Sequence, residues 1–217
     1  MRPPSDDLKK LLMESALSYR EQLKSLPEAQ AARDYLERRG ISEETAQAFG
    51  LGFVSEPHSA EDLPMRGRLS IPYKVHSYVH GWSIVTIRYR ALDPEQEPKY
   101  RSRKGDSTCL FNSAALNRHT DYICITEGEL DCISAEQAGL PAVGLAGADR
   151  WEDWTPRLFR GFRSVYVLQD NDKAGEKLAS RIAKSIANVK VIVMEDGDVN
   201  DTLVNRGEDF LRGLVNG

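Results

Sequence analysis

Hydrophobic residues over the first sixty positions recur with a helical period. Between Asp6 and about Leu26 they fall every three or four residues, which predicts an amphipathic helix with one buried face. Pro27 suits the first turn of a second helix, and Gly40 ends it. Ser42 has the side chain of an N-cap, so a third short helix is expected after it.

The next sixty positions favour strands. Residues 67–73 and 82–92 are rich in β-branched and aromatic side chains, which predicts two strands. Residues 91–100 contain two prolines and several acidic residues, and this composition is typical of a turn-rich connection. A further strand and loop are expected over residues 99–111.

From Asp121 onward, short apolar runs alternate with helical patterns. Runs of this kind, bounded by turns and separated by helices, indicate a parallel sheet covered on both faces. The predicted fold is therefore α/β, with a mixed α+β N-terminal subdomain over residues 1–120. It is followed at residues 121–217 by a domain with a central parallel sheet flanked by helices. The expected strands are 122–126, 142–145, 164–168 and 189–194, and the expected helices are 129–138 and 174–187.

Composition agrees with two compact globular subdomains. The chain has 217 residues, of which 41% are hydrophobic and 29% charged, close to the usual mixture for folded proteins. We find no apolar run near the roughly 18 residues of a membrane helix. The N-terminal residues include acidic side chains and no apolar stretch suited to a signal sequence, so we expect a cytoplasmic protein.

The chain has a net charge of −4, and its charged residues are distributed unevenly along it. Residues 1–120 carry 18 basic and 16 acidic side chains, whereas residues 121–217 carry 11 and 17. A surface facing a polyanion, followed by a surface that binds divalent metal ions, would produce this order, and so would ordinary solvated faces.

Cysteine and histidine give no zinc signal. The spacing of Cys109, Cys124 and Cys132 fits neither paired zinc ligands nor a disulfide framework, so these residues are expected to be reduced structural thiols. His76 and His80 have the i, i+4 spacing of a zinc helix. Their neighbours favour a strand, however, so we expect both on one strand face and no bound zinc.

Acidic residues follow three of the four predicted parallel strands. In such sheets ligands bind beyond the carboxyl ends of the strands, so these side chains are expected at one edge. Hard oxygen ligands with excess negative charge favour Mg²⁺ or Mn²⁺. Asp170 alone could equally be a helix N-cap, and Glu129 and Glu136 are expected to face solvent. The acidic residues of the edge are Glu127, Asp131, Asp170, Asp172, Asp196, Asp198 and Asp201.

Two motifs resemble those of the TOPRIM fold, the metal-binding module of DnaG-type primases, topoisomerases and some nucleases. An apolar strand ends in Glu127-Gly128 with Asp131 four residues later, which matches EGxxD. A second strand ends in Asp170 and Asp172, within a match to DxDxxG. The resemblance covers residues 121 to about 205.

The preceding half resembles DnaG-type primases, in a small phage- or plasmid-type form. Four segments occur in the family's order across roughly residues 33–116: a helix ending in RG that leads to a short strand, then GRLSIPY, then IVTIRYRAL, and then EPKYRS followed by LFN. This sequence departs from the family pattern after Tyr100, where Arg101 replaces an apolar residue and Ser102 replaces Asn. The order of the segments favours a primase core over an isolated TOPRIM module.

The resemblance implies synthesis of short RNA primers on single-stranded DNA from nucleoside triphosphates. It implies catalytic roles for Glu127, Asp170 and Asp172. The same three residues, with Asp131 and Asp198, would hold Mg²⁺ or Mn²⁺. Asn200 and Asp201 are alternatives for the third motif, whose register is ambiguous. Nucleotide or template binding is implied for Arg68, Arg90, Lys99 and Tyr100, with Arg103 and Lys104 adding charge nearby.

The resemblance also suggests partners and a location. We find no Cys/His zinc module before residue 33 and no GxxxxGK[ST] phosphate loop. Two interpretations fit this departure from larger primases. The chain is either a compact phage- or plasmid-type core, with a separate zinc-binding primase subunit and a replicative helicase as expected partners, or the excised core of a longer protein. No membrane contact is expected. A phage-encoded protein of this kind would work in the host cytoplasm.

Other functions stay open at this point. A TOPRIM nuclease uses the same acidic edge, whereas a topoisomerase needs a nucleophilic tyrosine, and we find no tyrosine in such a context. A non-catalytic DNA-binding scaffold would not need the full acidic set. A phosphatase with a DxD pair would normally carry it near the start of its domain, and here the pair comes late.

Overall fold

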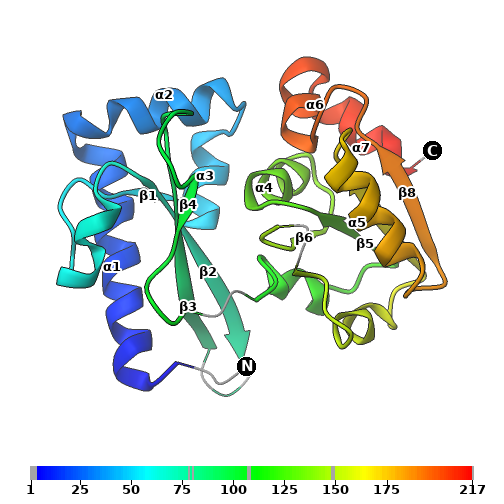
Figure 1. The fold of residues 1–217 in the computed structure, drawn as a ribbon, viewed down its shortest axis with the longest axis horizontal. Helices are drawn as coiled ribbons and strands as arrows, with labels where there is room; N and C mark the ends of the chain where they lie inside the picture. The colour runs from blue at the N-terminus through cyan, green and yellow to red at the C-terminus, as the bar shows by residue number, and fades with distance from the viewer. Residues whose placement is uncertain (1–3, 78, 80, 107–108, 148–149, 217) are drawn as a thin grey trace. The chain divides into compact units, whose positions relative to one another are not determined.

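The computed structural model describes residues 4–77, 79, 81–106, 109–147 and 150–216, and it divides into two compact units (Figure 1). The first unit covers residues 1–108 and the second covers residues 109–217. The predicted boundary lies further along the chain, between residues 120 and 121. Residues near 111 join the second unit because Phe111 exchanges backbone hydrogen bonds of 2.8 and 3.2 Å with Gly144.

The helices of the first unit begin and end as the polar pattern predicts. Ser42 caps the third helix by accepting a 3.1 Å hydrogen bond from the Thr45 backbone N–H. Gly50 ends that helix at φ 72°, a left-handed conformation that favours glycine. The elements are α1 (Asp6–Ser25), the 3-10 turn η1 (Pro27–Ala29), α2 (Gln30–Arg38), α3 (Glu43–Phe49) and the 3-10 turn η2 (Ala60–Met65).

The first unit also contains an antiparallel sheet in the order β1-β2-β3-β4. Helix α1 packs closely against it, since a Cβ atom at Gly52 would lie 2.5 Å from the Tyr19 carbonyl carbon. His76 lies in a strand, as expected, whereas His80 lies outside the described residues. The strands are β1 (Gly52–Phe53), β2 (Leu69–Ser77), β3 (Gly81–Arg90) and β4 (Tyr100–Arg101).

The second unit confirms the predicted parallel sheet, with the strand order β6-β5-β7-β8. Apolar side chains of β5 and β7, including Ile123 and Val167, pack with Ile182 of helix α5 in one buried cluster. The elements are η3 (Ser113–Asn117), β5 (Tyr122–Thr126), α4 (Glu129–Gln137), β6 (Ala142–Gly144), η5 (Thr155–Phe159), β7 (Ser164–Gln169), α5 (Lys173–Ala183), β8 (Val189–Val193), α6 (Val199–Arg206) and α7 (Glu208–Asn216).

Two expectations about helices need correction. Helices α6 and α7 follow β8, although we predicted no element there. Glu129 and Glu136 do not face solvent: Glu129 is fully buried, and Glu136 accepts hydrogen bonds from Asn112 and Arg118. Glu136 thereby joins the segment before β5 to α4. Among the described residues, no helix is both long and apolar enough to cross a membrane.

Candidate active site

Acidic side chains gather where the parallel strands of the second unit end. Glu127 directly follows β5 and Asp170 directly follows β7, and these two strands are hydrogen-bonded neighbours. Asp131 lies in the first turn of α4. Because β5 and β7 run parallel, their carboxyl ends share one edge, which brings residues 43 positions apart together.

Asp170 carries the clearest electrostatic signature of this edge. Burial raises its pKa to about 8, and repulsion from Asp131, Glu127, Asp198 and Asp172, in that order, contributes to the same shift. Each of these charges makes a further negative charge on Asp170 more costly. The other four carboxylates predicted as metal ligands therefore each interact electrostatically with Asp170.

The backbone around Asp170 is tightly packed. Glu127 and Asp170 line one small hollow of about 10 Å³, together with Gly175 of α5. A Cβ atom at Gly175 would clash with the Asp170 carbonyl oxygen, so the DxDxxG glycine lets the helix approach the strand end. The Asp170 Oδ1 atom is buried and has no hydrogen-bond partner among the described residues.

Two other acidic residues cap helices at the same edge. Asp172, rather than Asp170, is the N-cap of α5 and accepts a 2.7 Å hydrogen bond from the Gly175 backbone N–H. Asp198 is the N-cap of α6 and accepts a 2.6 Å bond from the Asp201 backbone N–H. A cap uses one carboxylate oxygen, so the second oxygen of each side chain can still serve a ligand.

The alternatives for the third motif occupy different positions. Asn200 is buried and its side-chain amide donates a 2.8 Å bond to Ser134 Oγ, which joins α6 to α4. Its backbone N–H donates to Asp131 at 3.3 Å. Asp201, the other alternative, lies in the first turn of α6, and its backbone N–H donates to the Asp198 side chain at 2.6 Å. Asp196, a further acidic residue of the edge, pairs with Arg206 at 2.7 Å and is not among the groups that shift the Asp170 pKa. Asp198 interacts with Asp170, and this favours it as the third-motif residue.

The donor set fits a hard divalent cation by its chemistry. It consists of carboxylate oxygens, it carries excess negative charge, and it includes a buried oxygen without a partner. Among the described residues, no three His, Cys, Asp or Glu side chains stand close enough to enclose one ion as they are placed. The carboxylate chemistry of this edge, and not a preformed cluster of three ligands, is what fits the ion.

Basic and aromatic residues cluster on one face of the first sheet. The Arg90 guanidinium donates to the hydroxyl groups of Tyr100 and Tyr35, the latter at 2.6 Å, and Arg88 lies 4.2 Å from the centroid of the Tyr100 ring. These contacts hold the guanidinium planes in fixed orientations. The predicted residues Arg90 and Tyr100 therefore form one cluster, which Tyr35 and Arg88 extend.

The other predicted basic residues are not part of this cluster. Lys99 and Lys104 are exposed, whereas Arg68 is 1% exposed and donates to the Pro98 carbonyl at 2.9 Å. Arg103 forms a buried ion pair with Asp62, with hydrogen bonds of 2.6 and 2.8 Å. The resemblance implies nucleotide or template binding for Arg103, but in the structure Asp62 neutralises its guanidinium charge, which makes Arg103 a structural anchor.

Sequence reasoning missed Asp62 entirely. It lies in η2, is fully buried, and also accepts hydrogen bonds from Tyr19 at 2.6 Å and Tyr89 at 3.0 Å. Burial alone would raise its pKa, but the bonds from Arg103 and Tyr19 outweigh that effect and lower it. A lone Asp in a polar loop has no periodic signal, so nothing in the sequence distinguished it.

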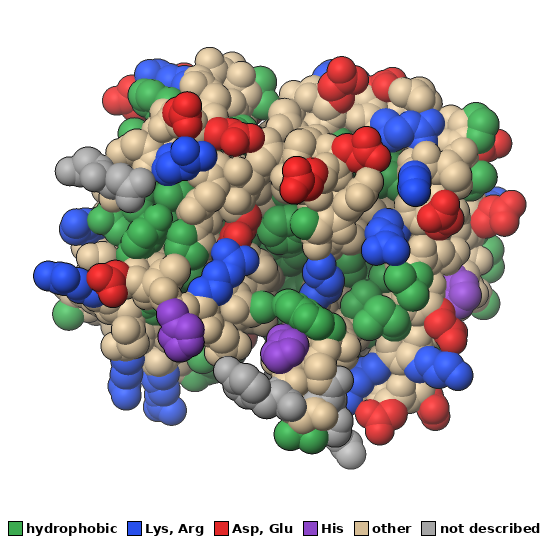
Figure 2. Space-filling model, turned by 180° about the vertical axis from the view of Figure 1, so that it is seen from behind, with side chains coloured by type: hydrophobic (Ala, Val, Ile, Leu, Met, Phe, Trp, Pro, Cys, Tyr) green, Lys and Arg blue, Asp and Glu red, His purple; other side chains and the backbone are tan. Residues whose placement is uncertain are grey.

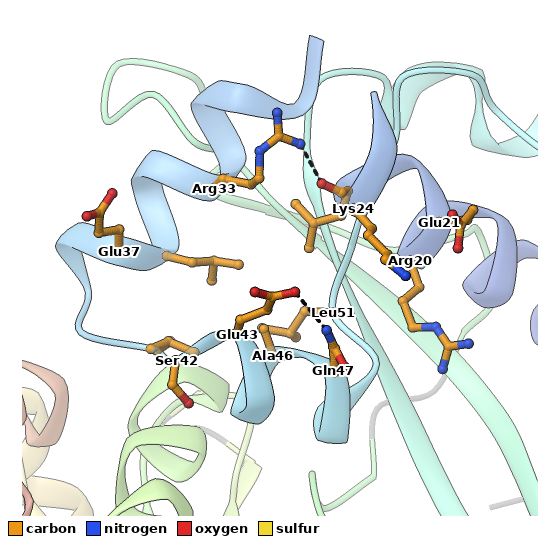
Figure 3. A pocket seen from close by; sticks show the side chains of 13 residues that line it. Arg20, Glu21, Lys24, Arg33, Glu37, Ser42, Glu43, Ala46, Gln47 and Leu51 are labelled. Carbon is orange, nitrogen blue, oxygen red and sulfur yellow. Dashed lines mark hydrogen bonds between the residues drawn. The ribbon is translucent and has the colours of Figure 1, made fainter. Parts of the chain in front are cut away.

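An open groove of about 730 Å³ lies among α1, α2 and α3 (Figure 3). Its floor includes Leu23, Leu36 and Leu51, all buried, and Arg33 on its rim donates to the Leu23 carbonyl at 2.6 Å. None of the residues predicted to be catalytic, metal-binding or nucleotide-binding lines this groove.

Comparison with known proteins identifies the family. A family described as Toprim-like matches residues 124–203. The chain is 43% identical over 147 residues to the gene 57 protein of Mycobacterium phage D29, a match that covers 67% of this chain and 96% of the phage protein. It is also 29% identical to the DNA primase of Pseudomonas aeruginosa over 99% of this chain. The chain belongs to the same family as the phage gene 57 protein, and it is a homologue of DnaG-type DNA primases.

The chain corresponds to only part of the longer primases that it resembles. The chain spans 39% of the length of the Pseudomonas aeruginosa primase. Among solved structures, it matches the RNA polymerase domain of Mycobacterium tuberculosis primase DnaG in complex with DNA, with a TM-score of 0.78 and 23% identity, covering 99% of this chain and 81% of that one. A primase domain from Pseudomonas aeruginosa gives a TM-score of 0.75 at 25% identity, covering 96% and 78%.

These results confirm the predicted fold and family. The mixed α/β architecture with a TOPRIM sheet is that of the DnaG catalytic core. Similarity to Toprim-like proteins and to DNA primases implies use of a divalent metal ion.

Proposed function

We propose that this chain is a primase catalytic core that synthesises short RNA primers on single-stranded DNA from nucleoside triphosphates. The observation that supports this most directly is that Glu127 and Asp170 directly follow two neighbouring parallel strands, β5 and β7, and so lie at one edge of the sheet. Burial of Asp170, together with repulsion from Asp131, Glu127, Asp198 and Asp172, raises its pKa to about 8. The DNA primase relatives support a nucleotidyl transfer of RNA polymerase type.

The acidic edge would hold Mg²⁺ or Mn²⁺ through its carboxylate oxygens, and we expect no zinc there. A divalent ion bound at such a site stabilises negative charge on triphosphate oxygens and on the leaving pyrophosphate. In this proposal Glu127 and Asp170 contribute oxygens from the strand ends, and Asp131 contributes from α4. Asp172 and Asp198 offer the carboxylate oxygens that their helix caps leave available.

The basic residues of the first unit would hold phosphate groups. Arg90 is oriented by Tyr35 and Tyr100, so its guanidinium can present a fixed set of donors. Exposed Lys99 and Lys104 would add charge for the template backbone without reading its sequence. We assign Arg103 a structural role, since Asp62 already neutralises its guanidinium charge.

Two kinds of partner protein are proposed by analogy with neighbours in fold. One solved neighbour is the Aquifex aeolicus primase with zinc-binding and RNA polymerase domains, at a TM-score of 0.74. Another is the primase fragment of the bacteriophage T7 primase-helicase protein, at a TM-score of 0.64. We propose that a separate zinc-binding subunit and a replicative helicase work with this chain, in the cytoplasm of a host cell if a phage encodes it.

The test is a primer-synthesis assay with single-stranded DNA, labelled nucleoside triphosphates and either Mg²⁺ or Mn²⁺. We expect metal-dependent oligoribonucleotides from the wild type and a loss of about 100-fold or more in Glu127→Gln and Asp170→Asn, as for loss of charge stabilisation in other active sites. Asp153→Asn, which changes an exposed carboxylate of the same unit, should retain full activity.

The same assay separates the competing functions. The reactions are run with and without an added zinc-binding primase protein and helicase, so that a need for partners is visible. Cleavage of DNA without nucleotides would support a nuclease instead. Primer synthesis that persists in Asp170→Asn would exclude the proposed role of the acidic edge.

A further inference from the structure

The exposed face of α5 carries a row of basic side chains. The helix packs its other face against the sheet, where Leu178 and Ile182 are buried with residues of β5 and β7 (Figure 1). Side chains three or four residues apart on a helix lie on the same face, so basic residues with this spacing form one row along the outer side of α5. We call this row the α5 stripe, and its members, all exposed, are Lys173, Lys177, Arg181 and Lys184.

The stability of the helix does not explain this row. Like charges four residues apart repel, and both Lys173 with Lys177 and Lys177 with Arg181 have this spacing. Lys173 also lies in the first turn, where the helix dipole favours negative charge. Glu176 is the single acidic residue of α5, and no member of the stripe forms an ion pair among the described residues. The repulsion within the stripe is therefore uncompensated by nearby carboxylates.

The sign of the stripe is opposite to the charge balance of the unit around it. Residues 121–217 carry 11 basic and 17 acidic side chains, yet residues 157–190 carry 8 basic and 3 acidic ones. The stripe begins beside the acidic edge, since Lys173 directly follows Asp172. From there it extends about 17 Å along α5, at the usual rise per residue of a helix.

The other exposed positions of α5 favour a nucleic acid over a protein as the ligand. They are small or polar: Ala174, Glu176, Ser180 and Ala183. The core of a protein–protein interface is depleted in charged residues and enriched in aromatic side chains. A phosphate backbone needs no such contacts, because Lys and Arg bind it through charge and the release of counterions.

We propose that the α5 stripe binds the sugar–phosphate backbone of a nucleic acid that extends away from the acidic edge. The regular row of positive charges complements a regular row of phosphates, and binding would relieve the repulsion between the lysines and the arginine. Contacts of this kind hold the backbone without reading base sequence. The inference rests on the proposed function for the two sources of this backbone, which are the single-stranded template and the RNA–DNA product.

Fluorescence anisotropy in EDTA tests the stripe without divalent ions at the acidic edge. One probe is a labelled single-stranded oligonucleotide, and the other is the same strand annealed to a short RNA. Lys177→Gln/Arg181→Gln removes two charges from the stripe and leaves Lys173, which adjoins the acidic edge, in place. We expect about tenfold or more weaker binding of at least one probe, since two phosphate contacts lose their counterion release. The slope of log K against log salt for the single strand should fall by about 1.4 if the stripe holds that strand.

Lys10→Gln/Arg38→Gln is the matched control, because it removes the same net charge from two exposed positions of the first unit. Lys177→Arg/Arg181→Lys keeps both charges and should bind as the wild type does, and thermal unfolding shows that each variant is folded. A greater loss for the single strand assigns the stripe to the template, and a greater loss for the hybrid assigns it to the product.

Three results would overturn the inference. The stripe variant could bind both probes as the wild type does, or lose no more affinity than the control variant. Its affinity could also fall only in proportion to unfolded protein. A poly-glutamate peptide that loses affinity in the stripe variant, while both nucleic acids keep theirs, would assign the stripe to an acidic protein instead.

The outcome is separable from the proposed function. A wild type that makes no primers, yet loses nucleic-acid affinity in Lys177→Gln/Arg181→Gln, would retain the stripe and exclude primer synthesis. A wild type that makes primers, with affinity for both probes and template KM unchanged in that variant, would retain primer synthesis and exclude the stripe.

Discussion

At the scale of single residues, Asp170 is central to the proposed metal site. Its carboxyl group is half-buried among four other carboxylates, and burial with their charges raises its pKa to about 8. Near neutral pH, and without a cation, the protonated form is therefore favoured. A divalent ion must displace that proton, so cation affinity should rise as pH increases toward 8.

Stability should depend on pH in the same window. Because the folded state holds a proton on Asp170 that the unfolded chain has released above its ordinary pKa of 3.8, the free energy of unfolding should fall as pH rises from about 4 to 8. Asp170→Asn should remove this part of the pH dependence and be more stable than the wild type at pH 9. Urea denaturation in EDTA at pH 6 and 9 measures both effects.

Asp153→Asn controls for general charge, since that carboxylate is exposed in the same unit. Equal pH dependence in the wild type and in Asp170→Asn would show that Asp170 titrates normally and that the carboxylates do not interact strongly.

At the scale of elements, packing decides whether the acidic edge forms. Gly175 allows α5 to start against the end of β7, since any Cβ atom there meets the Asp170 carbonyl oxygen. Gly175→Ala should therefore lower stability by about 1–3 kcal/mol, as overpacking does elsewhere. That corresponds to a fall in Tm of several degrees for a protein of this size.

Gly161→Ala is the comparison, because a Cβ atom at Gly161 meets no atom within 4 Å and its φ is not left-handed. Thermal unfolding followed by circular dichroism measures both variants. Equal Tm values for the two would contradict the close approach of α5 to β7.

A second element-scale prediction concerns the buried ion pair in the first unit. Asp62→Asn leaves the Arg103 guanidinium, whose side chain is 2% exposed, without its counter-charge. Removal of one partner of a buried pair typically costs about 3–5 kcal/mol. Asp209→Asn, which alters a pair whose acidic side chain is 96% exposed, should cost below about 1 kcal/mol.

The pH dependence of the same pair gives an independent check. The pKa of Asp62 is lowered in the folded protein, so its contribution is present above the ordinary carboxyl pKa of 3.8 and is lost as pH falls below it. The difference in free energy of unfolding between Asp62→Asn and the wild type should therefore become smaller in acid. A constant difference between pH 7 and pH 3 would mean that charge at Asp62 does not stabilise the fold.

At the scale of the whole molecule, the sequence predicted the parallel sheet well because its signals are local. The run at 122–126 matches β5, and the apolar runs near 164 and 189 match β7 and β8. Carboxylates after strands fall at one edge because parallel strands share their direction. Long-range pairing is different: the burial of Arg103 by Asp62 joins residues 41 positions apart, with no periodic pattern at either.

The distribution of charge along the sequence predicted the functional surfaces less well than the order of strands did. The basic excess before residue 120 suggested a surface facing a polyanion, yet Arg68, Arg90 and Arg103 are buried. Acidic and basic side chains are interspersed on the face shown in Figure 2. Helices α6 and α7 were missed, although Asp198 caps the first and Gly207 ends it, a pairing that predicts a helix.

Direct measurement of Mn²⁺ binding tests the central claim, that the carboxylates around Asp170 hold a divalent cation. Electron paramagnetic resonance of free Mn²⁺, titrated with the protein at pH 8, counts the bound ions. We predict saturable binding in the wild type and in Asp153→Asn, with affinity reduced about tenfold or more in Asp170→Asn and Glu127→Gln. Equal Mn²⁺ binding by the wild type and both acidic-edge variants would contradict the account.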